Sequence, residues 1–189
     1  MLKENLKDVQ ENILKACEKS GRNPEDVTLI AVSKTKPLED IQAAEAAGQR
    51  RVGESYAQEA ALKIDTLREQ AACQDIEWHF IGPLQSNKSR LVAERFDWVQ
   101  SVDRDKLIER LNNQRPAGLA PLNVCLQINI SGESSKSGTS EQEIFRLAAL
   151  VDQSERLVLR GLMAIPEHTS DEAVLAAQTL IVELKLLLE

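Results

Sequence analysis

The sequence predicts an α/β fold in which helices cover a parallel sheet. Strand-like and helix-like segments alternate along the whole chain, which is typical of parallel sheets. Polar or charged side chains stand at the carboxyl end of nearly every expected strand, and this favours a TIM-type (β/α)8 barrel. No GxGxxG motif follows the first expected strand, so the alternative of an open dinucleotide-binding sheet loses its main support. A complete barrel has eight strands, and about six are expected here.

Local patterns define each element of the first half. Apolar residues at helical spacing predict an amphipathic first helix, and Gly21 stands where it should end. Pro37 cannot continue a strand and suits the start of a helix, which Gly48 should close. The expected elements are a helix over 2–19, a strand over 27–32, a helix over 38–48, a brief strand from 51 that turns at Gly53, a helix over 56–70, and a strand with its loop over 76–83.

The second half repeats the alternation. Ser86 is expected to cap one helix and Ser140 another, because a serine hydroxyl can accept from the free N–H groups of a first helical turn. The expected elements are a helix over 86–94, a strand over 96–102, a helix over 103–114, a strand over 122–130, a polar loop over 131–138, a helix over 140–152, a strand over 157–166 and a helix over 171–188. Length and composition predict a single domain over residues 1–189.

Composition narrows the classes of function. The net charge of −7 argues against general nucleic-acid binding, which needs a basic face. The longest apolar runs are far shorter than a membrane span, and the first residues do not resemble a signal peptide, so a cytoplasmic protein is expected. Three widely spaced cysteines predict ordinary reduced thiols, and two histidines are too few for a His-rich metal site.

The stretch from Leu29 to Pro37 places two lysines where a strand stops. Alternation puts Val32, Lys34 and Lys36 on one face, with Lys34 nearer the core. A desolvated lysine beside a like charge favours the neutral amine, which can attack an aldehyde and form a Schiff base. The alternative is a lysine that extends to the rim and pairs with a carboxylate such as Glu54 or Asp103. Spacing alone leaves both interpretations open.

Five motifs, in this order, together resemble the pyridoxal 5′-phosphate homeostasis proteins, single-domain relatives of the alanine racemase barrel. The resemblance extends from the first helix to the last, and the motif that begins at Trp78 is too long for chance agreement. The motifs are Ala31-Val-Ser-Lys-Thr-Lys-Pro37, Gly53-Glu-Ser-Tyr-Ala-Gln-Glu59, Trp78-His-Phe-Ile-Gly-Pro-Leu-Gln-Ser-Asn-Lys88, Gln127-Ile-Asn-Ile130 with Ser135-Lys-Ser-Gly138, and Arg160-Gly-Leu-Met-Ala-Ile-Pro166.

The resemblance implies a cofactor site. Lys34 matches the lysine that holds pyridoxal phosphate as an aldimine, a Schiff base. Lys36 and the loop residue Lys136 match further lysines of the family and become candidate rim groups that accept or transfer the cofactor. Ser55, His79 and Met163 are further candidate contacts, although a packed or hydrogen-bonded core histidine and barrel filling are the alternatives for the last two.

Two departures from the family pattern affect these expectations. Ser55 stands where the family has asparagine, so a hydroxyl replaces an amide near the ring. The family also continues through two further strands that carry a Ser-x-Gly-Met-Ser-x-Asp phosphate loop and an Arg-x-Gly segment, and neither motif occurs in these 189 residues. A barrel without them would expose its sheet edges, through which copies could associate, whereas the family implies a monomer.

The resemblance favours a cofactor-handling protein over an enzyme, because the family lacks the second domain that gives alanine racemase its opposing base. No catalytic residue and no metal ligand are therefore expected. The implied partners are pyridoxal phosphate and apo-enzymes that accept it, with no nucleic acid and no membrane. The alternatives are a racemase-like pyridoxal phosphate enzyme of amino acids, and a truncated form that binds the cofactor weakly or not at all.

Overall fold

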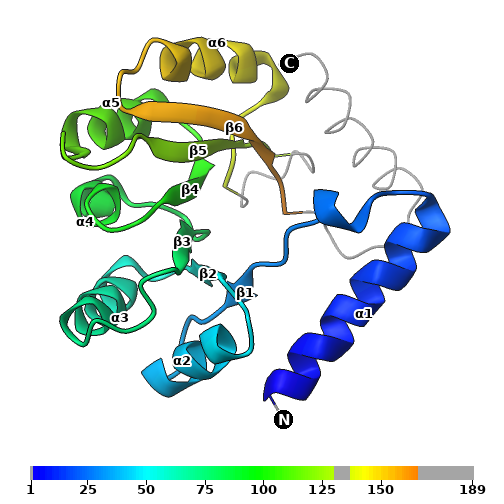
Figure 1. The fold of residues 1–189 in the computed structure, drawn as a ribbon. Helices are drawn as coiled ribbons and strands as arrows, with labels where there is room; N and C mark the ends of the chain where they lie inside the picture. The colour runs from blue at the N-terminus through cyan, green and yellow to red at the C-terminus, as the bar shows by residue number, and fades with distance from the viewer. Residues whose placement is uncertain (1, 130–136, 166–189) are drawn as a thin grey trace. The chain divides into compact units, whose positions relative to one another are not determined.

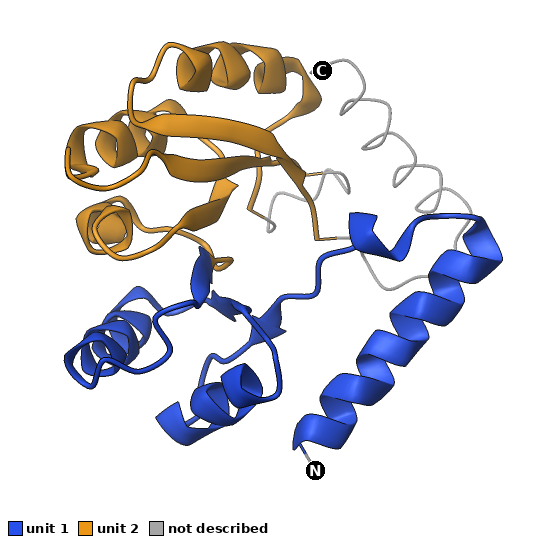
Figure 2. Ribbon diagram, viewed as in Figure 1, with its two compact units in different colours: residues 1–79 blue, residues 80–189 orange. Residues whose placement is uncertain are grey.

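A computed structural model describes residues 2–129 and 137–165. The chain divides into two compact units, residues 1–79 and 80–189, which are described one at a time (Figure 2). In both units helices and strands alternate along the chain (Figure 1), which confirms the predicted α/β class. Six strands are found within the described residues, in agreement with the expected number. The predicted single domain over 1–189 stays a prediction.

The first unit is a small parallel sheet with its helices. In the strand order, β2 lies between β1 and β3, and in the register of β1 with β2, Ala31 lies opposite Val52 and Val32 opposite Gly53. Glu77 N–H donates to the carbonyl of Arg50 at 2.8 Å, where β3 begins beside β2. The elements are α1 (Leu2–Ser20), the 3-10 helix η1 (Pro24–Asp26), β1 (Ala31–Val32), α2 (Leu38–Ala46), β2 (Arg51–Glu54), α3 (Ala57–Glu69) and β3 (Glu77–Phe80), whose last residue belongs to the second unit.

The two glycines that were predicted to end the first two helices do so. Gly21 has φ +67° directly after α1, and the next residue donates its N–H to the carbonyl of Cys17 at 3.0 Å. Gly48 has φ +97° two residues after α2. Glycine occupies this left-handed region without the steric cost of a Cβ, and the turn satisfies carbonyls that the helix leaves free. Both helices therefore end where the sequence predicts.

The first strand is shorter than predicted. Only Ala31–Val32 pair regularly, whereas the expected strand began at residue 27. Asn23 caps a 3-10 turn by accepting from the N–H of Glu25 at 3.2 Å. Among the described residues β1 pairs with β2 alone, so its remaining backbone groups have no second strand to hold them in an extended ladder.

The second unit continues the same pattern, with its strands in the order β4-β5-β6. Pairing is parallel, and the register shifts once between β5 and β6, where Gly161 lies opposite Cys125 with φ +145°. The elements are η2 (Ser86–Lys88), α4 (Ser89–Ala93), β4 (Trp98–Val102), α5 (Asp105–Gln114), β5 (Leu122–Gln127), α6 (Glu141–Asp152) and β6 (Leu157–Met163).

Two boundaries in this unit differ from the expectation. The helix predicted over 86–94 starts as a 3-10 turn, so Lys88 rather than Ser86 precedes α4. The alternating strand predicted to reach 130 pairs regularly only to Gln127, after which an isolated bridge joins Ile128 to Thr139. The end of that strand, the loop with Lys136, the end of the last strand and the helix over 171–188 lie outside the described residues.

A dense apolar core holds the second unit together. Phe80 and Phe96 meet edge to face, with ring centroids 5.4 Å apart and an interplanar angle of 86°. The guanidinium of Arg115, a buried residue, donates to the carbonyls of Ala93 and Phe96, both at 2.7 Å. These bonds satisfy backbone acceptors between α4 and β4 that would otherwise be buried without a partner. Fully buried core residues include Val99, Leu107, Leu111, Leu122, Val124, Leu126 and Ile144.

Replacing Phe96 by alanine should destabilise the protein strongly. Its side chain is fully buried, so Phe96→Ala leaves a cavity and removes the edge-to-face contact, at a cost of about 3–5 kcal/mol. Phe145→Ala is the matched control, because Phe145 is 47% exposed on α6 and its loss should cost roughly 0.5 kcal/mol or less. Urea unfolding followed by circular dichroism measures both values, and equal effects would contradict this description of the core.

Candidate functional site

The two lysines that the sequence singles out lie in a tight turn after β1. Val32 ends the strand, and the N–H of Lys36 donates to the carbonyl of Ser33 at 3.0 Å, which closes the turn around Lys34. The face that Val32 shares with both lysines is exposed, whereas Ser33 on the other face is buried. Both lysines are therefore exposed, because β1 ends at Val32 and the chain turns before it reaches Lys34.

The side chains of Lys34 and Lys36 are free within the part of the chain that the structure describes. Neither ammonium group forms a hydrogen bond or ion pair with any described residue. The carboxylate of Glu54, which sequence reasoning offered as a partner for Lys34, instead pairs with Lys63 at 2.8 Å. The other carboxylate offered, Asp103, pairs with Arg104. An exposed primary amine of this kind is accessible to a ligand.

A buried polar network lies directly beneath this turn. The hydroxyl of Ser33 donates to Glu54 Oε1 at 2.6 Å, and Lys63 Nζ reaches the same oxygen. Lys63 also donates to the carbonyl of Ser33 at 2.8 Å and to Glu59 Oε1 at 2.6 Å. Glu59 Oε1 in turn accepts from the N–H of Thr35 at 2.7 Å. Helix α3 is thus joined to β2 and to the turn through charged hydrogen bonds.

The network favours the charged forms of Lys63 and Glu59. Burial alone would lower the pKa of Lys63, but hydrogen bonds to Glu54 and Glu59 outweigh burial and hold that pKa above its ordinary value. The hydrogen bond from Lys63 has the largest effect on the pKa of Glu59 and lowers it. Burial opposes this effect, and the N–H of Thr35 lowers the pKa further. Glu54 is fully buried, and its second oxygen has no hydrogen-bond partner among the residues that the structure describes.

Parallel pairing brings Ser55 to the same edge of the sheet as the two lysines. The N–H of Ser33 donates to the carbonyl of Gly53 at 3.0 Å, so the carboxyl ends of β1 and β2 stay together. Ser55 follows β2 in a bend and is half-buried. The three predicted site residues Lys34, Lys36 and Ser55 therefore follow two neighbouring strand ends, where barrel enzymes and binding proteins place their sites.

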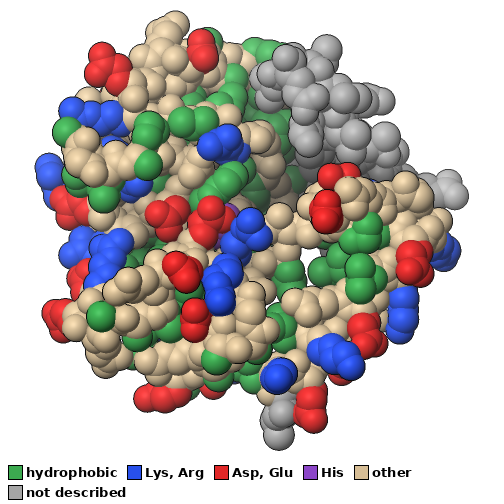
Figure 3. All heavy atoms as spheres, in the orientation of Figure 1, with side chains coloured by type: hydrophobic (Ala, Val, Ile, Leu, Met, Phe, Trp, Pro, Cys, Tyr) green, Lys and Arg blue, Asp and Glu red, His purple; other side chains and the backbone are tan. Residues whose placement is uncertain are grey.

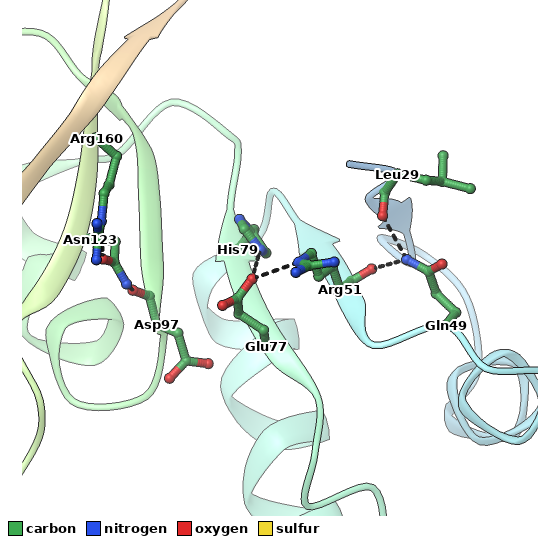
Figure 4. Close-up of polar contacts among 8 residues, drawn as sticks. All are labelled: Leu29, Gln49, Arg51, Glu77, His79, Asp97, Asn123 and Arg160. Carbon is green, nitrogen blue, oxygen red and sulfur yellow. Dashed lines mark hydrogen bonds and ion pairs between the residues drawn. The ribbon is translucent and has the colours of Figure 1, made fainter. Parts of the chain in front are cut away.

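His79 belongs to a different group of side chains in the first unit. Its ring Nε2 lies 2.9 Å from Glu77 Oε1, and the same oxygen accepts from Arg51 at 3.1 Å (Figure 4). Gln49 joins neighbouring backbone by donating to the carbonyls of Leu29 and Arg51. His79 is buried, so its geometry is that of a hydrogen-bonded core histidine, and its contact with a cofactor stays a prediction.

The two remaining candidate site residues are Met163, which lies in the second unit, and Lys136. Met163 is the half-buried last residue of β6, and its carbonyl accepts from the N–H of Ile128 at 2.9 Å. Lys136 lies outside the described residues. In the same unit Arg160 donates to Asn123 Oδ1 at 2.7 Å (Figure 4). Its guanidinium also lies over the ring of Trp98, which gives this charged strand residue a structural role.

A groove opens beside the turn in the first unit. Its volume is about 580 Å³, and apolar residues of α1, β1 and α2 line most of it, with Ser33 and Lys36 among its polar residues. Figure 3 shows hydrophobic side chains exposed along α1 where this face is hollowed, and it shows Lys, Arg, Asp and Glu side chains intermixed over the rest of the face. A continuous basic surface of the kind that binds nucleic acid is not seen there.

Other kinds of site find little support in the described residues. Burial raises the pKa of the Cys125 thiol to about 11 and also raises that of Cys73, so neither thiol is activated. No cluster of histidine, cysteine and carboxylate side chains suited to a metal ion occurs in residues 2–129 and 137–165. Within the same ranges, every helix is too short or too polar to cross a membrane.

Sequence reasoning missed Lys63 and Glu59, which hold the turn in place. The sequence does contain an indication of this pair, because a glutamate four residues before a lysine on a helix can form an ion pair with it. That spacing usually marks a weak surface pair. What it could not show is that α3 packs this pair against the fully buried Glu54.

Comparisons with known proteins agree on one family. The family model described as alanine racemase, N-terminal domain, matches residues 5–185. The pyridoxal phosphate homeostasis protein of Escherichia coli K12 is 56% identical over 167 residues, which cover 88% of this chain and 71% of that protein. The protein of the same name from Pseudomonas aeruginosa is 54% identical over 172 residues, 90% of this chain and 72% of the relative.

A solved structure extends the agreement to three dimensions. PipY of Synechococcus elongatus with PLP bound is 33% identical, with a TM-score of 0.70 over 92% of this chain and 82% of that protein. Alanine racemase from Corynebacterium glutamicum has a TM-score of 0.61 at 14% identity, and this likeness shows the fold alone. The predicted barrel type, that of the alanine racemase N-terminal domain, is confirmed.

The acid stability of the protein should depend on Glu59. The pKa of Glu59 is lowered in the folded state, so its carboxylate contributes to the free energy of unfolding above the ordinary pKa of 4.5. This contribution is lost as the pH falls through the folded-state pKa. Glu59→Gln keeps the shape and an acceptor for Thr35 but does not titrate. The free energy of unfolding of this variant should therefore fall less steeply than that of the wild type below pH 4.5. Urea titrations at a series of acid pH values measure the slope, and equal slopes would contradict the prediction.

Proposed function

Because the chain belongs to the pyridoxal phosphate homeostasis protein family, we propose that it binds pyridoxal 5′-phosphate through a Schiff base on Lys34. The cofactor's aldehyde supplies the carbon that the amine attacks, with loss of one water molecule. The likeness to PipY, whose structure holds PLP, supports the same ligand here at 33% identity.

The observation that carries the proposal is the accessible amine of Lys34. It stands in the turn at the carboxyl end of β1, is exposed, and has no side-chain partner among the described residues. A lysine used only for stability would be expected to pair with a nearby carboxylate, yet Glu54 and Glu59 are both engaged by Lys63. The buried network fixes the backbone of the turn and leaves the amine free for chemistry.

The neighbouring residues fit an aldehyde that carries a phosphate. Lys36 offers a second exposed ammonium group, and an anionic ligand is attracted to such a pair of cations. Ser55 can donate or accept a hydrogen bond at the adjoining strand end. Under this proposal Lys36 and Lys136 are rim groups that accept or transfer the cofactor, and Ser55, His79 and Met163 contact it.

The proposed role is to hold and hand on the cofactor, with no reaction catalysed on an amino acid. The relatives are named for homeostasis, which supports this role. The likeness to alanine racemases stays below 25% identity in the structures compared, so it supports no racemase activity. Apo-enzymes that need the cofactor are the proposed acceptors, and a monomer in the cytoplasm belongs to the same proposal.

Incubation with pyridoxal phosphate followed by borohydride reduction should attach the cofactor to Lys34. Reduction makes the carbon–nitrogen bond permanent, so peptide mass spectrometry locates it, and absorbance follows the Schiff base before reduction. Lys34→Ala should abolish both signals. Lys106→Ala is the matched control, because Lys106 is an exposed lysine on α5 and its loss should change neither signal. A Lys34→Ala protein with an unchanged spectrum would refute the assignment.

A further inference from the structure

Lys63 is a buried lysine that the proposed chemistry does not use. The residue is 9% exposed, and its three hydrogen-bond donors are all engaged, by the carbonyl of Ser33, by Glu54 and by Glu59. A buried ammonium group with this many partners has one fixed position. Its location on α3 matters because two of these contacts lead to the turn that carries Lys34.

The contacts of Lys63 reach both sides of Lys34. On one side the ammonium group holds the carbonyl of Ser33 directly at 2.8 Å. On the other side it holds Glu59, whose carboxylate accepts from the N–H of Thr35 at 2.7 Å. The residues before and after Lys34 are thus fastened to a single buried charge, while the Lys34 side chain itself stays exposed.

The turn needs such fastening because its backbone is strained. Thr35 has φ +62°, a left-handed conformation that is unfavourable for a β-branched residue. Strained residues persist only where surrounding contacts hold them. The hydrogen bond from the N–H of Thr35 to Glu59 is such a contact, and Glu59 depends on Lys63 for its own position.

A purely structural role would require only part of this arrangement. The buried carboxylate of Glu54 needs a cation, and the 2.8 Å contact with Lys63 supplies it. That need does not account for the bonds to the Ser33 carbonyl and, through Glu59, to the Thr35 N–H. Both of these bonds end on the turn.

We infer that Lys63 is a positioning residue, which acts through Ser33 and Glu59 to fix the turn that presents the amine of Lys34 to an aldehyde ligand. The inference rests on the proposed function of Lys34. It predicts that loss of Lys63 slows attack by Lys34 without removing the amine that attacks.

The experiment measures how fast pyridoxal phosphate labels each lysine in the full chain. Samples are reduced with borohydride at successive times, and peptide mass spectrometry gives the rate at Lys34 and at the surface residue Lys106. Since a small misplacement of a reacting group costs up to about 10²-fold, Lys63→Met should slow the labelling of Lys34 by about tenfold or more. Labelling of Lys106 should not change, so the ratio of the two rates separates positioning from a general loss of folded protein.

Two further variants keep the test decisive. Lys7→Met is the matched control, because Lys7 also pairs with a glutamate four residues later but on the exposed face of α1, at 3.6 Å. Its labelling ratio should equal that of the wild type. Glu59→Ala removes the acceptor for Thr35 and leaves the pair of Lys63 with Glu54 in place, so it reports on the turn if Lys63→Met does not fold. It too should lower the labelling of Lys34.

The outcomes distinguish the inference from the proposed function. A folded Lys63→Met or Glu59→Ala protein that labels Lys34 at the wild-type rate would overturn the positioning role and leave the cofactor site standing. A wild-type protein with no label on Lys34 would overturn the proposed function, and the inference with it. Slower labelling at Lys34 in both variants, with Lys7→Met and Lys106 unaffected, supports the inference.

Discussion

The first unit depends on one buried charge, the ammonium group of Lys63 between Glu54 and Glu59. Glu54 lies on β2 and is fully buried, so its carboxylate is tolerated only because a cation and a hydroxyl meet it. Removing one partner of a buried ion pair typically costs about 3–5 kcal/mol, since the other charge is left uncompensated. The same contacts join α3 to the end of β1, where a strand of only two paired residues could not define its own continuation. Stability and the position of Lys34 therefore depend on the same atoms.

Much of the fold could be predicted from local chemistry. Gly21 and Gly48 ended their helices as expected, because a left-handed residue after a helix is a local requirement. The boundaries that differ depend on partners that sequence does not show. β1 pairs regularly only at Ala31–Val32, because the chain turns directly after it, where the N–H of Lys36 donates to the carbonyl of Ser33. The segment from Ser86 begins as a 3-10 turn, with the Ser89 hydroxyl bonded to the Ser86 carbonyl and to Gln114, 25 residues further on. Alternation thus predicts the existence and order of elements better than their ends.

The site was predictable only in part, for a similar reason. Lys34 and Lys36 were found because lysines at the end of an apolar run are conspicuous, but the alternation that grouped them could not tell which face was buried. Ser33 is the buried residue, and its hydroxyl and carbonyl both contribute to the network. Glu59 and Lys63 had the spacing of an ordinary surface pair, and their importance comes from tertiary packing against Glu54. A charged residue can therefore be visible in a sequence while its role is not.

Lys34 and Lys63 differ in burial and in their contacts, and this difference bears on the function of the protein. Lys63 is buried and fully bonded, whereas Lys34 is exposed and has no side-chain partner among the described residues. A Schiff base on an exposed amine can be displaced by an incoming amine from another molecule, which attacks the same carbon and releases the lysine without any oxidation or reduction. Such an exchange needs an accessible bond and a fixed turn, and it does not need an opposing catalytic base. Under the proposed function, the exposed amine of Lys34 on a turn held by Lys63 would suit a protein that holds a reactive aldehyde reversibly and gives it up to an acceptor.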